Sequence, residues 1–431
     1  MADLEKLTSQ ITTLINSANS MTGNNDDNLT DGINSLINGY GKNSESSYFP
    51  NGYLVTVFDY DGTILKEERL LEGSTFVLPS LPKNPRLKFH SWSSTVDVKN
   101  NTIIVPDYDV TIGPIYTTVS GATEFDIRIY NAGYSDNDLL VNWNYTTTGL
   151  TRIDWGDGVV NTETSHEYSN YGDYTIKAYG ITSIECDRNS GVSLWCNRIL
   201  LADTVTDITG SEGLDSAGYL SLPPSLTYIE EGVASYYTTH ITFPNSLTEL
   251  PDYVCCSTSS LRSVVIPNTV TSIGESAFDG LDYLKYACVP DSVTYLGDCV
   301  FYGCGALSSQ IKLSNVTIIP EEAFHNCYTI PKITLNDNIT SIKQRAFYYC
   351  CDLAELKMPA ALTEIETFAF GCCFRIREYD FTSAQCVPLV WGNDIVETWY
   401  SDIRILVPAN LYDAWINEPS WEDYVNYIEC V

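Results

Sequence analysis

The chain has 431 residues, is 44% hydrophobic, and carries a net charge of −32 from 55 acidic and 23 basic residues. The length allows three or four domains, and the apolar content is that of a folded protein. The excess of acid argues against nucleic acid as a partner, because phosphate binding needs clustered lysine and arginine. No apolar run reaches transmembrane length, so no membrane contact is expected.

Residues 1–47 are expected to form a helical attachment or oligomerisation segment. Apolar residues follow the 3-4-3-4-3 spacing of a heptad seam at six positions: Leu4, Leu7, Ile11, Leu14, Ala18 and Met21. Helices this short are unstable alone in water, so the segment either pairs with its own copies, a trimer being favoured, or docks onto a larger assembly. A helical hairpin packed on its own domain is the alternative. No secretion signal is visible at this end.

This opening segment is similar to those of tail and fibre proteins from phages of Gram-positive hosts. The resemblance implies attachment to other virion proteins.

Residues 48–119 are expected to form a small β-unit, with strands near 54–58, 76–78, 87–89 and 102–105. Asp59-Tyr60-Asp61-Gly62-Thr63 has the D-x-D-G-T form found in haloacid-dehalogenase phosphatases, where the first Asp is the nucleophile and the second the general acid. Those enzymes need a parallel sheet, a downstream lysine and a further acidic pair, for which this segment has no room. The Asp-Gly pair is also a hairpin signal, and the turn is the favoured interpretation.

Two motifs in this unit resemble the internalin-type β-repeat. They are Phe89-His90-Ser91-Trp92 and the closing stretch from Val110 to Tyr116. The resemblance implies an antiparallel, β-grasp-like unit that serves as a spacer in surface proteins.

Residues 120–182 are expected to form an immunoglobulin-like β-sandwich. Trp155-Gly156-Asp157-Gly158, His166-Glu167-Tyr168 and Gly172-Asp173-Tyr174 resemble the polycystic-kidney-disease (PKD) domain. Asp154 and Asp157 are candidate calcium ligands, since calcium takes carboxylate and carbonyl oxygens. The favoured alternative is that Asp157-Gly158 is a hairpin turn and Trp155 a core anchor, so no cofactor is expected, calcium being the one possibility.

Residues 183–390 contain a repeat with a period of 23. Its most visible column is a pair of letters: Ala277-Phe278, Val300-Phe301, Ala323-Phe324, Ala346-Phe347 and Ala369-Phe370. A period of this size predicts a solenoid whose turns bury their apolar sides against one another. Short β-branched stretches such as 263–266 and 332–335 are expected to be its strands.

The stretches 266–284 and 289–307 resemble the BspA-like leucine-rich repeats, which read I-P-x-x-V-x-x-I-x-x-x-A-F-x-x-C-x-x-L. This resemblance implies a curved parallel solenoid in bacterial or phage surface proteins that bind partners, and it implies no enzyme. Residues 391–431 resemble the closing cap of the same family, with an amphipathic helical run that ends at Ile428.

Four cysteines occupy one repeat column: Cys304, Cys327, Cys350 and Cys373. A ladder of buried thiols is the favoured interpretation. Disulfides between successive turns are the alternative, since the spacing of stacked turns permits them.

The chain is therefore expected to be mainly β and modular: short helices, a β-grasp-like unit, an immunoglobulin-like unit and a capped leucine-rich-repeat solenoid. The expected function is that of a non-enzymatic phage virion appendage whose solenoid binds a host cell-surface protein or glycan. A bacterial cell-surface adhesin built from the same modules is the alternative. Tyrosines outside the apolar columns are the partner-binding candidates: Tyr236, Tyr237, Tyr348 and Tyr349.

Overall fold

The computed structural model describes residues 52–129, 139–143, 145–186, 196–210, 214, 218–234, 236–256, 258–354, 356–392 and 403–431. The chain divides into two compact units, Met1–Gly52 and Tyr53–Val431. The predicted heptad segment lies outside the described residues, so its helices and its oligomeric role stay predictions. The described chain is mainly β, with only 4% helix, and contains a β-solenoid of about ten turns. None of its helices is long and apolar enough to cross a bilayer.

The first β-unit is a mixed four-stranded sheet. Its strand order is β2 (Ile64–Leu70), β1 (Tyr53–Phe58), β6 (Val110–Thr118) and β4 (Leu87–Ser94), and a separate antiparallel pair joins β3 (Thr75–Val77) to β5 (Thr102–Ile104). β1 and β6 are parallel in the centre, whereas both outer strands are antiparallel to their neighbours. The predicted strands are confirmed, but the expected antiparallel arrangement is wrong at the centre of the sheet, where β1 and β6 are parallel. The relation to internalin-type repeats stays a prediction.

The second β-unit consists of two facing sheets that close around Trp155 and Phe125, both fully buried. One sheet has the order β11 (Val160–Asn161), β10 (Arg152–Asp154), β13 (Gly172–Tyr179), β7 (Ala122–Ile129) and β15 (Cys196–Leu200). The other has the order β18 (Tyr228–Ile229), β16 (Asp207–Thr209), β14 (Ser183–Cys186) and β9 (Tyr145–Thr148), and β12 (Ser165–Glu167) pairs with β8 (Leu140–Asn142). The PKD resemblance itself stays a prediction.

These two sheets continue into the solenoid. β14 pairs antiparallel with β9 on one side and parallel with β16, the start of the repeat ladder, on the other. One buried cluster runs from Phe125 without interruption to Ile428. The second β-unit therefore closes the first turn of the stack and acts as its amino-terminal cap, which a solenoid needs because an end turn has no neighbour on one side.

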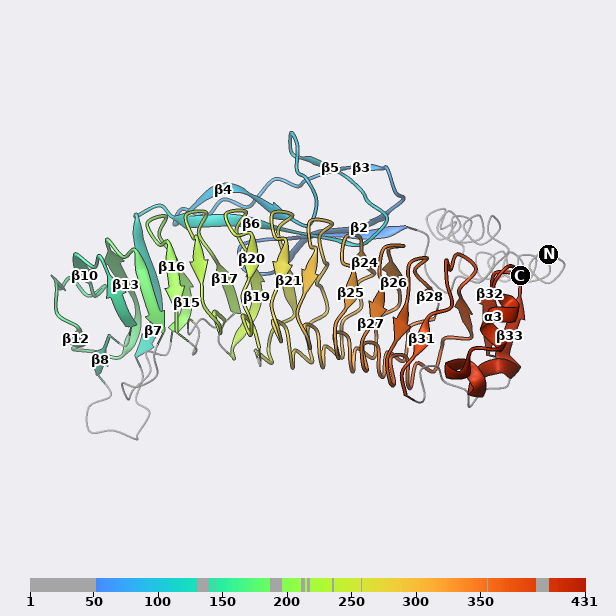
Figure 1. Cartoon of the computed structure of the whole chain (residues 1–431). Coiled ribbons are helices and arrows are strands. Elements are labelled where there is room, and N and C mark those ends of the chain that lie inside the picture. Colours follow the sequence, from blue (N-terminus) through green and yellow to red (C-terminus); the bar gives the residue numbers. More distant parts are fainter. Residues whose placement is uncertain are drawn as a thin grey trace, which may run out of the picture. The chain divides into compact units, whose positions relative to one another are not determined.

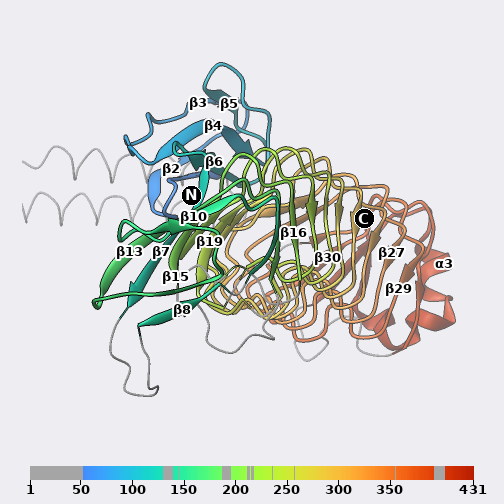
Figure 2. The same ribbon diagram turned by 90° about the vertical axis from the view of Figure 1, so that its left-hand side faces the viewer.

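The solenoid has two faces, each made of parallel strands (Figures 1 and 2). The first, here the β17–β33 face, contains β17 (Gly218–Ser221), β19 (Thr238–Thr242), β21 (Ser263–Val265), β24 (Ile311–Leu313), β26 (Ile333–Leu335), β28 (Leu356–Lys357), β30 (Glu378–Asp380), β32 (Arg404–Val407) and β33 (Ile428–Cys430). The second, here the β16–β31 face, contains β16, β18, β20 (Glu249–Leu250), β22 (Ser272–Ile273), β23 (Tyr295–Leu296), β25 (Ile318–Ile319), β27 (Ser341–Ile342), β29 (Glu364–Ile365) and β31 (Leu389–Val390). Within each face, paired strands are parallel and about one repeat apart in sequence.

The phenylalanines of the repeated pair form a stacked ladder inside the coil. The ring centroids of successive pairs from Phe278 to Phe370 lie 5.2, 5.5, 5.7 and 5.3 Å apart, with interplanar angles of 17°, 14°, 6° and 5°. All five rings are fully buried. The 23-residue period thus superimposes the same ring in every turn.

The cysteine column forms a second internal ladder. The thiols of Cys304, Cys327 and Cys350 each lie 3.1–3.2 Å from the carbonyl oxygen of the phenylalanine 26 residues earlier, and Cys373 repeats the contact. All four are free and fully buried, so the packing interpretation is confirmed. Burial raises the pKa of each thiol well above its usual value, because the low-dielectric core disfavours the thiolate.

The carboxyl end is closed by α3 (Tyr412–Ile416), the 3-10 helix η1 (Pro419–Tyr427) and β33. Trp415 and Trp421 are fully buried, and their rings lie 5.2 and 5.6 Å from that of Phe381 in the last regular turn. The Trp421 indole N–H donates to the carbonyl oxygen of Pro388 at 2.7 Å. These contacts bear out a terminal cap.

The first β-unit packs on the amino-terminal part of the β17–β33 face. β6 contacts β17, β19 and β21. The Ser93 hydroxyl donates to the carbonyl oxygen of Phe243 at 2.6 Å. The backbone N–H of Asn268 donates to the carbonyl oxygen of Ser94 at 2.8 Å. The fully buried His240 ring packs against Phe58 at 4.6 Å and Tyr219 at 5.1 Å. This half of the face is therefore occupied by the chain itself.

Candidate partner-binding surface

Each turn of the solenoid has a corner between the Ala/Val-Phe pair and the next strand of the β17–β33 face. In three turns the second residue after the phenylalanine has a positive φ although it is not glycine: Asn326 (61°), Tyr349 (60°) and Cys372 (61°). The N–H of Asn326 donates to the carbonyl oxygen of Tyr348 in the next turn at 2.9 Å, and the N–H of Tyr349 donates to that of Gly371 at 2.9 Å. These bonds hold the left-handed conformation, which costs about 1–2 kcal/mol per residue outside glycine. The corners are thus fixed in register from turn to turn.

Exposed aromatic side chains gather at these corners. They are termed the aromatic edge, with exposed fractions as follows: Tyr236 58%, Tyr237 47%, Tyr283 64%, Tyr328 45%, Tyr349 36% and Phe374 38%. Tyr283, Tyr328, Tyr349 and Phe374 lie two to five residues after the phenylalanine of the pair in their turn, whereas Tyr236 and Tyr237 follow Val233-Ala234, which replaces the pair. The edge therefore collects large, partly apolar side chains after the pair position of several turns, at offsets that differ from turn to turn.

The edge is continuous across three successive turns. The ring of Tyr349 lies 6.5 Å from that of Tyr328 and 6.4 Å from that of Phe374. Tyr348 packs against Tyr349 at 4.7 Å and against Phe368 at 5.8 Å. The Phe324, Phe347 and Phe370 rings of the internal ladder belong to the same turns, so a rigid core supports this row.

Charged groups flank the row. Arg345 donates to Glu322 at 3.0 Å, and its guanidinium lies 5.9 Å from the Phe368 ring centroid. Burial, with a smaller contribution from Cys372, raises the pKa of Tyr348 to about 12, so the phenol stays neutral and able to donate.

The four predicted tyrosines fall into two groups. Tyr348 and Tyr349 belong to the continuous row, with Tyr348 half-buried below it. Tyr236 and Tyr237 form a pair of their own, with ring centroids 5.4 Å apart, at the corner before β19. The sequence reasoning missed Tyr283, Tyr328 and Phe374. They lie four or five residues after the repeated phenylalanine of their turn, and this recurrence was the signal that would have identified them.

The other predicted sites are turns. Asp59 and Asp61 lie at the β1–β2 hairpin, where Asp59 accepts from the Tyr60 N–H at 2.7 Å and Asp61 from the Thr63 N–H at 3.0 Å. This confirms the hairpin interpretation.

Asp154 and Asp157 also bond within a turn. Asp154 accepts from the Gly156 N–H at 3.0 Å, while Asp157 accepts from the Val159 N–H at 3.1 Å and lies 2.7 Å from Nε2 of His166. Despite partial desolvation, the His166 contact and the backbone bond keep the pKa of Asp157 below its usual value. Within the described ranges, no group of three or more His, Cys, Asp or Glu side chains is arranged to hold a metal ion.

The repeat is assigned by comparison with protein families. Residues 199–285 and 276–386 match the model of the BspA type leucine rich repeat region, in six copies. The aromatic edge lies entirely within this leucine-rich-repeat region.

Solved structures with similar folds are bacterial leucine-rich-repeat proteins. One is a leucine-rich repeat protein from Bacteroides ovatus, with 18% sequence identity, a TM-score of 0.34 and an alignment that covers 58% of this chain and 76% of that chain. Another is a leucine-rich repeat protein from Eubacterium ventriosum, with 18% identity, a TM-score of 0.34 and coverage of 51% of this chain and 77% of that chain. A leucine rich cell surface protein from Faecalibacterium prausnitzii is also similar, with 18% identity, a TM-score of 0.26 and coverage of 59% of this chain and 84% of that chain. No curated protein matches the sequence. At these identities and TM-scores, the similarities add nothing to the assignment of a function.

Proposed function

We propose that this protein is a non-enzymatic adhesin of the cell-surface type, which binds a protein or glycan on another cell through its aromatic edge. The observation that carries the proposal is the continuous row of Tyr328, Tyr349 and Phe374 across three rigid turns. BspA-type repeats support it, since the family resemblance implies surface proteins that bind partners.

The chemistry of the edge suits recognition. Tyrosine offers a large ring with few rotatable bonds and a hydroxyl at its tip, which is why it is frequent among residues that dominate binding energy. The stacked core beneath the row fixes the spacing of the rings, so little conformational entropy is lost on binding. A partner with apolar patches and hydrogen-bonding groups at a matching spacing would bind the three turns together.

Binding is favoured over catalysis by the placement of the acidic motifs. The D-x-D-G-T segment is a hairpin turn, and the carboxylates of Asp154 and Asp157 bond to their own turn. The virion role rests on residues 1–47 and gains no support from the comparisons, so it stays a prediction. The cell-surface role is preferred because it rests on the repeats themselves.

The test measures adhesion of beads coated with the full chain to an epithelial cell monolayer. The variant Tyr328→Ala/Tyr349→Ala/Phe374→Ala is expected to reduce retention about tenfold or more, because loss of one strong contact already costs about 2 kcal/mol. The matched control is Tyr228→Ala/Tyr295→Ala/Trp391→Ala, whose side chains are 51–58% exposed and lie in or beside strands of the β16–β31 face.

Retention of the control variant should equal that of the unchanged chain. Pretreatment of the cells with protease or with glycosidases distinguishes a protein partner from a glycan. The proposal fails if unchanged beads do not adhere, or if both triple variants lose adhesion equally.

A further inference from the structure

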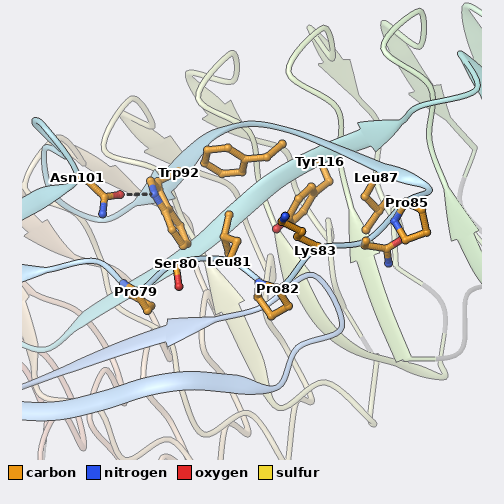
Figure 3. A pocket seen from close by; sticks show the side chains of 12 residues that line it. Pro79, Ser80, Leu81, Pro82, Lys83, Pro85, Leu87, Trp92, Asn101 and Tyr116 are labelled. Carbon is orange, nitrogen blue, oxygen red and sulfur yellow. Dashed lines mark hydrogen bonds between the residues drawn. The ribbon is translucent and has the colours of Figure 1, made fainter.

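The first β-unit contains a groove that lies apart from the aromatic edge. Its volume is about 700 Å³, within the usual range for ligand sites. One wall is the proline-rich loop 79–85, and the other is formed by Leu87 and Trp92 of β4 with Tyr116 of β6 (Figure 3). Phe89 of β4 also lines the groove. The groove is thus built by a single β-unit and does not depend on the solenoid corners.

Aromatic rings form the platform of the groove. Phe89 lies 5.5 Å from Trp92 and 5.7 Å from Tyr116, with its ring tilted edge-on to both. Phe89 is 41% exposed. The Trp92 indole N–H donates to Oδ1 of Asn101 at 3.1 Å (Figure 3). Nδ2 of Asn101 donates in turn to the carbonyl oxygen of Leu78 at 2.9 Å. These bonds fix the Trp92 ring before any ligand arrives.

The charge of the groove is opposite to that of the chain. None of the residues that line it is Asp or Glu, and Lys83 is among them. The surrounding stretch 73–96 contains no acid, in a protein with a net charge of −32. Two other cations of this stretch are engaged, Arg86 with Glu124 and Asp126, and Lys88 with Asp203. Lys83 has no carboxylate partner among the described residues.

We infer that this groove binds an acidic saccharide, one sugar ring stacking on Trp92 with Phe89 beside it and its carboxylate facing the Lys83 ammonium. The apolar C–H face of a pyranose matches an aromatic ring in size and polarity. Ser80 and Asn84 at the rim supply polar atoms for hydroxyl groups. The site would be a second binding site, independent of the edge proposed above.

A proline-rich peptide fits the groove less well. Such peptides expose backbone carbonyls that need donors from the groove, since a polyproline helix has no internal hydrogen bonds. The indole N–H that would serve is already bonded to Asn101. Stacking of a sugar uses a ring face and needs no donor from the indole, and Phe89 beside Trp92 is 41% exposed.

Isothermal titration of the full chain with defined saccharides tests the inference. The probes are a hyaluronan hexasaccharide and sialyllactose as carboxylate-bearing sugars, with a chitin hexasaccharide and lactose as neutral counterparts. At least one acidic probe should bind more tightly than its neutral counterpart, and its affinity should fall with added salt. The two acidic probes distinguish a uronic acid from a sialic acid as the recognised unit.

Variants locate the binding. Trp92→Ala should lower the affinity for the acidic probe about tenfold or more. Trp92→Phe should lower it less, because an aromatic ring is kept. Lys83→Gln should lower the affinity for the acidic probe about two- to fivefold and remove its dependence on salt concentration. Trp391→Ala and Lys99→Gln are the matched controls, an exposed tryptophan and an exposed lysine outside the groove.

The inference is overturned if neither acidic probe binds, if both Trp92 variants bind as the unchanged chain does, or if a proline-rich peptide binds in preference. Thermal melting of each variant shows whether the fold is retained. If Trp92→Ala does not fold, the Trp92→Phe and Lys83→Gln results decide.

Discussion

Replacement of Phe324 by alanine tests how the repeat holds itself together. The ring is fully buried and stacks on Phe301 at 5.5 Å and on Phe347 at 5.7 Å. Removal of a buried phenylalanine costs about 3–5 kcal/mol, and each stacked pair adds about 0.5–1.5 kcal/mol beyond burial. Phe324→Ala should therefore lower the stability of its turn by about 4–8 kcal/mol.

A double-mutant cycle isolates the stacking contribution. Phe324→Ala combined with Phe347→Ala should show a coupling of about 0.5–1.5 kcal/mol, because the two rings touch. Phe278→Ala combined with Phe347→Ala should be additive within about 0.5 kcal/mol, because two other rings lie between them.

Native-state hydrogen exchange is the suitable assay. A solenoid opens as a series of coupled turns, and amide protection resolves the stability of each turn. The ladder account is refuted if the adjacent pair shows no coupling, or if the distant pair couples as strongly as the adjacent one.

Three further predictions concern pH, backbone packing and thiols. Burial lowers the pKa of His240 to about 3. Between pH 6.5, near the pKa in the unfolded chain, and about pH 3, the unfolded chain therefore binds one more proton than the folded chain, and the free energy of unfolding should fall by about 1.4 kcal/mol per pH unit on acidification. Urea titrations should show a shallower fall for His240→Gln. Gly297→Ala should lower the melting temperature more than Gly172→Ala, since a Cβ at 297 overlaps the backbone of the preceding turn whereas one at 172 meets its nearest atom, on the Tyr174 ring, at 3.6 Å. Equal losses would contradict this. In the folded chain at pH 8, iodoacetamide should modify the exposed Cys430 and leave the buried Cys327 unmodified until urea is added; rapid labelling of Cys327 would exclude a closed ladder.

The sequence was sufficient for the solenoid because its period places one residue type in one position of every turn. The predicted strand 263–266 is observed as β21, and the predicted strand 332–335 as β26. β2 was not predicted, because its residues Ile64–Leu70 are rich in charge, as is common for an edge strand.

The joining of the modules was also not predictable. The predicted boundary between residues 182 and 183 falls just before β14, yet β14 pairs with both the second β-unit and the solenoid. The periodicity of apolar side chains predicts which residues are buried, but it does not predict which strands are neighbours in a sheet. For the same reason, the sequence identified Tyr349 as a candidate but did not place it between Tyr328 and Phe374.

The central claim is that the aromatic edge contacts the partner. Hydroxyl-radical footprinting of the chain, free and bound to fixed epithelial cells, tests it most directly, because tyrosine and phenylalanine rings are oxidised where solvent reaches them. The account predicts that bound chains are protected at Tyr328, Tyr349 and Phe374, while Tyr295 on the β16–β31 face is oxidised as in the free chain. Protection at Tyr295 with unchanged oxidation along the edge would contradict the account.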